Sequence, residues 1–270
     1  MGAGPEHLLA SGLTERLTKH GHELAATSIE LPHDVFFPEI QAAFELDRRL
    51  ASRVRSAIEN GSFPLVLSGN CITSIGTIAG LDAAELGVVW LDAHGDFNTP
   101  DTTIGGFLDG MALAIVTGRC WQPLAATVPG FQPVDDRSVM LLGARHLDPA
   151  EHDLLTSSDV ERLSANSLRD GAYKNLGRMR EHTRDVYLHI DLDVLDPAEG
   201  RVNGFVAPNG LLLGELRKVV SDVAKVFLVR AAAVTAYDPA YDSDSRVCEA
   251  AIVLIETLLD AVNESTAVFH

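Results

Sequence analysis

The sequence predicts a three-layer α/β/α fold with a mostly parallel central sheet. Two observations lead to this prediction. Short apolar runs recur along the chain, and amphipathic stretches with apolar residues at three- and four-residue steps lie between several of them. Strands that are buried on both faces read as continuous apolar runs, so this alternation is typical of a parallel sheet that is covered by helices.

Five apolar runs are expected to form strands: 63–69 (FPLVLSG), 87–94 (GVVWLDAH), 139–146 (VMLLGARH), 186–193 (VYLHIDLD) and 226–238 (VFLVRAAAVTAYD). A helix should begin near Thr73, and the clearest helical periodicity covers 38–59, 213–224 and 245–262. Ser243 or Asp244 is a candidate cap for the last helix.

The chain shows no internal repeat, low-complexity tract or interdomain linker. The Gly- and Pro-rich stretches 97–110 and 196–210 are too short to separate domains, and they are expected to be functional loops. We therefore expect residues 1–270 to form a single domain.

The amino-acid composition indicates which binding partners and which cellular compartment to expect for this protein. The 38 acidic and 21 basic residues give a formal charge of −17, which argues against a nucleic-acid partner because phosphate backbones would be repelled. Cys71, Cys120 and Cys248 are too scattered for a disulfide framework and fit a reducing compartment. No signal-peptide pattern and no run of ~20 apolar residues occurs, so a soluble, cytoplasmic protein without a membrane partner is expected.

The strongest chemical signal follows the apolar run GVVW. Alternate residues of an extended segment face one side, so Asp92, His94 and Asp96 should converge beyond the end of a buried strand. A second strand runs into Asp191 and Asp193 in the same way. Open parallel sheets bind ligands at the carboxyl ends of their strands, so these five side chains are expected to share one crevice.

Carboxylates that crowd together repel one another, and desolvation raises the cost of ionising them, so such a cluster needs cations. Oxygen-rich ligands with an imidazole suit manganese or a comparable ion, and two such ions can generate a hydroxide nucleophile near neutral pH. A DxHxD motif alone is also compatible with helix capping or a turn. The second acidic pair is what favours a metal site.

The chain resembles the ureohydrolase family, which includes arginase, agmatinase and formiminoglutamase and hydrolyses guanidino or formimino groups with two manganese ions. The resemblance runs nearly end to end and is carried by Gly4-Pro5 with a following helix, LSGNCITSIGTIAG, DAHGDFNTP, GARHLDPAEH, HIDLDVLDP, VAPNGLLLGEL and Tyr237-Asp238-Pro239. It implies the arginase-like three-layer fold. Only three residues precede Gly4, where the family places a strand, so that strand is either missing or cut off.

The resemblance also implies roles for individual residues. Asp92 and Asp191 would each bridge two divalent ions, His94 and Asp193 would complete one site, and Asp96 would help to complete the other. The water that bridges the metals would be the nucleophile. Contacts to the substrate are implied for Asn98, Thr103 and Asp148, although each of these also suits loop and turn chemistry.

Two departures from the family pattern affect the metals and the acid/base group. The family usually reads Gly-Gly-Asp-His, with a ligating His, where this chain reads Ser68-Gly69-Asn70-Cys71. Cys71 would then ligate metal as a thiolate and shift preference from Mn²⁺ toward Zn²⁺ or Fe²⁺, unless it is only a packing residue. A proton-shuttling His of the family falls at Asp109, which is either the catalytic acid/base or a solvated turn residue.

Two further departures concern the substrate. The family's guanidinium-binding Glu corresponds to Ala236, and two positions that recognise a carboxylate are Gly105 and Phe107. Gly105 still offers its backbone N–H, but neither residue has a polar side chain. Efficient use of arginine is therefore not expected.

We expect a binuclear metal-dependent hydrolase of a linear amidine or guanidino C–N bond, with Asp109 and His94 as its catalytic side chains. His189, His146 and Tyr237 are less favoured stand-ins for Asp109. The alternatives are an N-hydroxyguanidine or guanidino-acid hydrolase, a formiminoglutamase-like enzyme, and an idle homologue that only binds metal or a ligand. The resemblance further implies a homo-oligomer, either a trimer or a hexamer.

Overall fold

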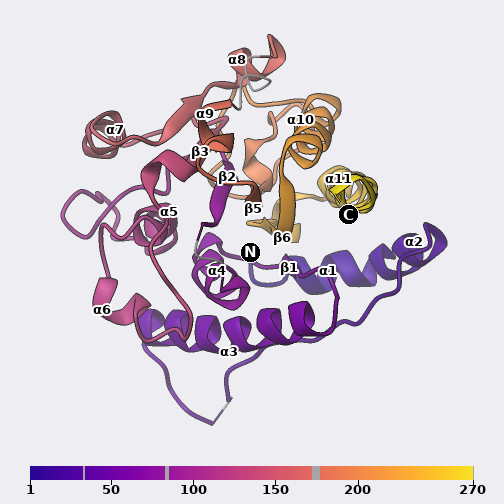
Figure 1. Ribbon diagram of the computed structural model, residues 1–270, viewed down its shortest axis with the longest axis horizontal. Helices are drawn as coiled ribbons and strands as arrows, with labels where there is room; N and C mark the ends of the chain where they lie inside the picture. The colour runs from indigo at the N-terminus through magenta and orange to yellow at the C-terminus, as the bar shows by residue number, and fades with distance from the viewer. Residues whose placement is uncertain (33, 83–84, 172–176, 270) are drawn as a thin grey trace.

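The computed structural model describes residues 1–32, 34–82, 85–171 and 177–269. Its centre is a six-stranded sheet in the order β1-β6-β5-β2-β3-β4, in which all neighbouring strands are parallel. The strands are β1 (Leu65–Leu67), β2 (Gly87–Leu91), β3 (Val139–Leu142), β4 (Glu161–Leu163), β5 (Asp185–Asp191) and β6 (Leu228–Thr235). Helices cover both faces of this sheet (Figure 1), which confirms the predicted three-layer α/β/α class.

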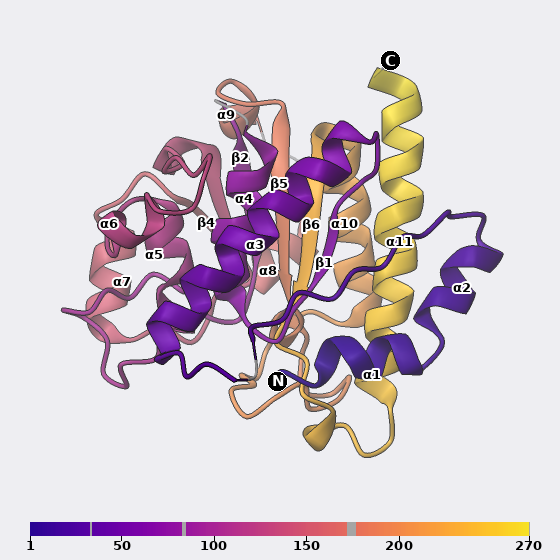
Figure 2. The same ribbon diagram turned by 90° about the horizontal axis from the view of Figure 1, so that it is seen from below.

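One face of the sheet is covered by α3 (Glu39–Glu59), α4 (Ser74–Leu81) and α5 (Ala112–Val116). Figure 2 shows α3 crossing in front of the strands. Its apolar positions Phe44, Leu50, Ala51 and Val54 recur at the helical period and are buried, which is why this sequence forms an amphipathic helix.

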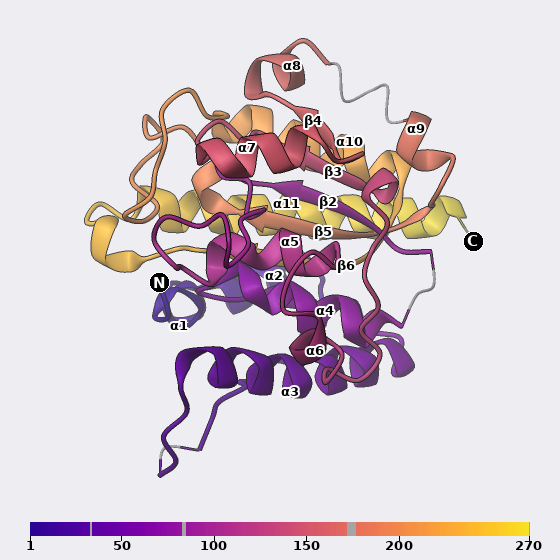
Figure 3. The same cartoon turned by 90° about the vertical axis from the view of Figure 1, so that its left-hand side faces the viewer.

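The opposite face is covered by α10 (Leu213–Val226) and α11 (Arg246–Phe269), with α1 (Gly4–Ala10) and α2 (Leu13–Lys19) packed at the edge. Figure 3 shows the strands between α3 and α4 on one side and α10 on the other. The remaining helices are short: α6 (Gln122–Ala125), α7 (Pro149–Thr156), α8 (Ala165–Arg169) and α9 (Gly177–Arg180).

The burial of the central strands explains why they could be predicted from the sequence. All five residues of β2 are buried, as are six of the seven in β5, so both strands read as continuous apolar runs. The edge strand β4, Glu-Arg-Leu, has no fully buried residue and gives no such signal. For that reason the sequence predicted five of the six strands.

The cap of α11 differs from the expected one. Neither Ser243 nor Asp244 is the main cap, because both oxygens of Asp242 accept hydrogen bonds from the first turn, from Val247 N at 3.1 Å and Cys248 N at 2.8 Å. Asp244 accepts a longer, 3.4 Å bond from Arg246 N, and its other oxygen accepts from Arg246 Nε at 2.6 Å. The backbone bends before the helix through Ser245, whose φ is 58°, and this bend moves the cap back along the chain.

Along the described helices, we find no stretch with the length and apolar character that a bilayer crossing requires.

Candidate metal centre

The carboxyl ends of the central strands bring the predicted acidic motifs together. β2 runs directly into Asp92, and β5 ends at Asp191 and continues into the short helix η5 (Leu192–Val194). The two strands are hydrogen-bonded neighbours, with Leu91 opposite Ile190. Cys71 reaches the same edge from β1 because it begins the short helix η1 (Cys71–Thr73) that follows this strand.

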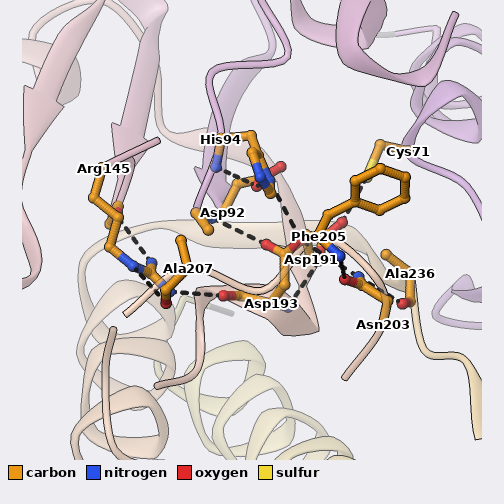
Figure 4. Close-up of polar contacts among 12 residues, drawn as sticks. Cys71, Asp92, His94, Arg145, Asp191, Asp193, Asn203, Phe205, Ala207 and Ala236 are labelled. Atoms are coloured by element: carbon orange, nitrogen blue, oxygen red, sulfur yellow. Dashed lines mark hydrogen bonds and ion pairs between the residues drawn. The ribbon is translucent and has the colours of Figure 1, made fainter. Parts of the chain in front are cut away.

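Two compact groups of ligand-type side chains form there, and they share one residue. The first contains Cys71, Asp92 and Asp191, and the second contains Asp92, His94 and Asp193; within each group the ligand atoms lie within 4.8 Å of one another. Five of the six predicted ligands thus meet in one place (Figure 4). Asp96 is buried and turns through a φ of 48°, but it belongs to neither group, so its ligand role stays a prediction.

Burial of several acids at one point disfavours their ionised forms. Loss of water, followed by the negative charge of Asp193, raises the pKa of Asp191 well above its ordinary value. Burial and the charge of Asp92 raise the pKa of Asp96 in the same way. These buried acids therefore repel one another, and bound cations would relieve that repulsion.

His94 is the one positive partner within the cluster. Its Nδ1 lies 3.3 Å from Asp92 Oδ1 and 3.3 Å from Asp193 Oδ2. Burial lowers the pKa of this imidazole, but hydrogen bonds and charges from Asp193 and Asp92 outweigh it and raise the pKa to about 12. In the protonated imidazole, the Nδ1–H faces the oxygens of Asp92 and Asp193, so a metal ion that binds His94 here must displace this proton.

Backbone and side-chain donors fix the orientation of the carboxylates. Asp92 accepts from Trp90 Nε1 at 3.0 Å and from His94 N at 2.7 Å. Asp193 accepts from Ala93 N at 3.2 Å. These bonds hold the oxygens in place before any ligand arrives.

Cys71 is buried at the start of η1 and is bonded on two sides. Its thiol donates to Asp191 Oδ2 at 3.1 Å and lies 3.2 Å from Thr235 Oγ1. Burial, reinforced by the charge of Asp191, raises the pKa of this thiol well above its ordinary value. Cys71 therefore points into the cluster.

A chain of buried polar groups continues behind Cys71. Thr235 Oγ1 lies 3.3 Å from His189 Nε2, and His189 Nδ1 lies 2.8 Å from Tyr187 Oη. The Trp90 ring stacks on His189 with centroids 3.7 Å apart. Burial lowers the pKa of His189 to about 3, so this ring is neutral. His189 therefore supports Cys71 through Thr235, and it belongs to neither ligand group.

Asp109 lies beside Cys71 and is fully hydrogen-bonded. Its Oδ1 accepts from Ile72 N at 2.8 Å and its Oδ2 accepts from Asn70 Nδ2 at 3.0 Å. Burial raises the pKa of this carboxyl to about 6, against the opposing effect of the two donors. The interpretation as a solvated turn residue is wrong, because Asp109 is only 7% exposed.

The predicted substrate contacts fall into two sets. Asn98 and Asp148 meet through a 3.1 Å bond from Asn98 Nδ2 to Asp148 Oδ2. Asp148 also caps α7, in a capping box with Glu151. Thr103 stands apart from this pair and accepts from Gly106 N at 3.0 Å, inside the loop that follows β2.

Three residues that hold the site in place were not predicted from the sequence. Asn203 donates to Asp193 Oδ2 at 3.4 Å and to Ala236 O at 3.0 Å. Arg145 donates to the backbone oxygens of Asp193 and Ala207, both at 2.9 Å. Glu151 accepts from Phe97 N at 2.9 Å. Only Arg145 and Glu151 stood in a quoted motif, GARHLDPAEH, and no local pattern marks Asn203.

Three further residues that the sequence analysis singled out are Ala236, His146 and Tyr237. Ala236 is buried at a φ of 62°, and its side chain is an uncharged methyl group. The ring of His146 lies 5.4 Å from that of His94, in an edge-on arrangement. Tyr237 Oη donates to Asp242 at 3.0 Å on the α11 side, which places this hydroxyl outside the two ligand groups.

The chain is similar in sequence to known arginases along nearly its whole length. Residues 2–260 match the sequence profile of the Arginase family. The arginase of Bacillus caldovelox is 28% identical over 275 residues, which cover 94% of this chain and 91% of that protein. The arginase of Bacillus subtilis is 28% identical over 269 residues, which cover 95% of this chain and 90% of that protein.

Solved structures agree with the sequence matches. The native arginase of Bacillus caldovelox superposes with a TM-score of 0.83 at 27% identity, covering 95% of this chain and 91% of that one. An agmatine ureohydrolase of Thermoplasma volcanium shares the fold, with a TM-score of 0.65 at 20% identity, covering 86% of this chain and 72% of that one.

Proposed function

Since this chain belongs to the arginase family, we propose that it hydrolyses a C–N bond of a guanidino or related linear amidine compound with the help of two divalent metal ions. One observation carries the proposal. Two groups of three ligand-type side chains share Asp92, which is the arrangement that a pair of adjacent ions requires.

The donor set fits such ions, but the two groups differ in chemistry. Asp92, His94 and Asp193 offer oxygen and nitrogen atoms, which suit Mn²⁺. Cys71 adds a soft sulfur to the other group and favours Zn²⁺ or Fe²⁺ there. When bound, the ions would supply a strong nucleophile at neutral pH by acidifying water, and they would neutralise the acidic cluster.

The protein's own part is to orient the ligands and to handle the leaving-group proton. Trp90 and Asn203 hold the carboxylates of Asp92 and Asp193 through direct hydrogen bonds. Asp109 carries the proton for the leaving amine. Two facts support this role: its carboxyl lies next to Cys71, and burial raises its pKa to about 6, close to neutral pH.

The substrate is expected to be weakly basic or differently held from arginine. Asn98 and Asp148, which are joined by a 3.1 Å hydrogen bond, and Thr103 are the proposed polar contacts to the substrate. Ala236 provides no carboxylate for a guanidinium, and a cation bound in a desolvated pocket without a partner loses several kcal/mol. An N-hydroxyguanidine or another weakly basic C=N compound avoids that loss.

Metal analysis and a substrate panel test this proposal together. Protein purified without chelator should contain close to two divalent ions per chain. A panel of arginine, agmatine, N-hydroxyarginine, guanidinobutyrate and formiminoglutamate, assayed with Mn²⁺, Zn²⁺ or Fe²⁺, should give turnover with at least one compound. Metal binding without any turnover would instead identify an idle homologue, and absence of metal binding would overturn the site itself.

Self-association is part of the same proposal. Many of the compared proteins carry the name arginase, and by resemblance to that family we expect a trimer or hexamer. Light scattering on the purified protein gives the subunit number directly. The three cysteines are free and buried, which supports assembly in a reducing, cytoplasmic environment.

A further inference from the structure

Two aromatic rings from distant loops stack on each other at the surface. Phe107 lies in the loop after β2, and Phe205 lies in the loop after η5. Their ring centroids are 5.5 Å apart with an interplanar angle of 21°. Both residues remain exposed, at 42% and 51% of their full surface, so a large part of each is accessible to a ligand.

Both rings are tied closely to the metal-ligand cluster. Phe107 is two residues from Asp109, whose carboxylate accepts from Ile72 N, beside Cys71. The backbone N–H of Phe205 donates to Asn203 Oδ1 at 2.7 Å, and Asn203 in turn donates to Asp193. Figure 4 draws Phe205 next to Asn203 and the acidic cluster. The two rings therefore stand at the rim of the site.

The chemistry of this rim is apolar along a continuous stretch. Residues 104–107 have the sequence Ile-Gly-Gly-Phe, and Ile104 is 79% exposed. No side chain in that stretch can donate a hydrogen bond. A carboxylate held against it would lose water without gaining a side-chain partner, whereas an aryl or alkyl group would gain contact with the rings.

We propose that Phe107 and Phe205 form the subsite for the far end of the substrate, and that this end is an uncharged aryl or alkyl group and not an α-amino acid. This inference rests on the proposed function for the reacting end of the substrate. It makes a separate claim about the tail, which is recognised by stacking and apolar contact.

The experiment compares guanidines that differ only in their tails: phenylbutylguanidine, agmatine and 4-guanidinobutyrate. Phenylbutylguanidine should show the highest kcat/KM, about tenfold or more above guanidinobutyrate, because one well-stacked ring is worth that factor. Phe107→Ala and Phe205→Ala should each reduce this preference severalfold. The matched control is Phe36→Ala, which removes another ring that is 88% exposed and should leave the preference unchanged.

Binding to metal-free protein separates this inference from the proposed function. Saturation-transfer NMR should show contacts from the phenyl protons in the unmodified protein and much weaker ones in Phe107→Ala. Tail-selective binding in a protein that turns over neither these guanidines nor any compound of the substrate panel would support the subsite and defeat the proposed reaction. Turnover that favours charged tails, or an aryl preference untouched by both Phe variants, would overturn the subsite. A change of subunit number in Phe205→Ala with unchanged tail preference would assign the rings to a subunit contact and also overturn it.

Discussion

The two groups of metal-ligand side chains, which share Asp92, are held in place by different kinds of contact. The His94 half contains Asp92, His94 and Asp193, and the Cys71 half contains Cys71, Asp92 and Asp191. The half around His94 uses residues from two strand ends and is completed by local bonds, such as those from His94 N to Asp92 and from Asp193 N to Asp191. The half around Cys71 depends on contacts between four separate segments, which include Thr235 at the end of β6 and Asp109 before α5. The first half offers oxygen and nitrogen atoms to a metal ion, whereas the second half also offers the sulfur of Cys71.

The polar residues of the second half depend on one another. Asn70 donates to Asp109, so an Asp at position 70 would instead place two carboxylates against each other. Cys71 lies between this pair and Asp191. A change at any one of these positions alone would leave an unpaired acid or an empty volume, which indicates that they function as a unit.

The residue shared by both halves should give the largest effect when it is changed. Asp92→Asn is expected to abolish binding of both ions and to reduce kcat/KM by about a thousandfold or more. Metal content by atomic emission and steady-state kinetics measure this. Asp153→Asn is the control, because that side chain is 89% exposed on α7. Retention of one tightly bound ion in Asp92→Asn would contradict the shared role.

Cys71→Ala should weaken one ion selectively and leave the His94 half intact. The loss should exceed the ~10- to 100-fold that removal of an outer-shell partner costs. In Co²⁺-loaded protein the thiolate charge-transfer absorption should disappear. Cys71→His should preserve or strengthen Mn²⁺ binding, whereas Cys120→Ala, which removes another buried free thiol, should change neither ion. Unchanged affinities in Cys71→Ala would make Cys71 a packing residue.

Ala236→Glu tests whether a missing charge limits arginine. The unmodified protein is expected to have low kcat/KM with L-arginine, and the Glu variant should raise it by about tenfold or more, because a buried ion pair with the guanidinium is restored. Ala236→Gln, of the same shape without charge, is the matched control and should not raise it. Since Ala236 already adopts a φ of 62°, the longer side chain adds little backbone strain. High arginase activity in the unmodified protein would contradict the substrate argument.

The smallest expected effect on kcat/KM is at His189, which lies behind Cys71 and should affect stability instead. Its pKa is about 3 when folded and 6.5 in its ordinary state, so the unfolded chain binds the extra proton between these values. Stability should therefore rise with pH from about 3 to 6.5, by at most ~1.4 kcal/mol per pH unit from this group. His189→Gln should flatten that slope in urea unfolding of chelator-treated protein. An identical slope in both proteins would show that His189 is not buried in its neutral form.

Much of the molecule could be predicted from local patterns. Buried strands and amphipathic helices depend on periodicity along the chain, so β2, β5, α3 and α11 were visible in the sequence. The motifs at Asp92 and Asp191 were visible for the same reason, because alternate residues of a strand face one side. The edge strand β4 and the cap Asp242 were missed, since neither has a distinctive local pattern.

The sequence by itself determined the fold class and the acidic strand ends, because each depends on residues that are close together in the chain. Only the tertiary structure decided which distant side chains complete the centre. The strand order places β6 between β1 and β5, and so brings Thr235 against Cys71 and His189. The contact of Asn203 with Asp193 and the stack of Phe107 on Phe205 depend in the same way on where two loops meet. Such contacts have no periodicity, since they follow from the path of the whole chain.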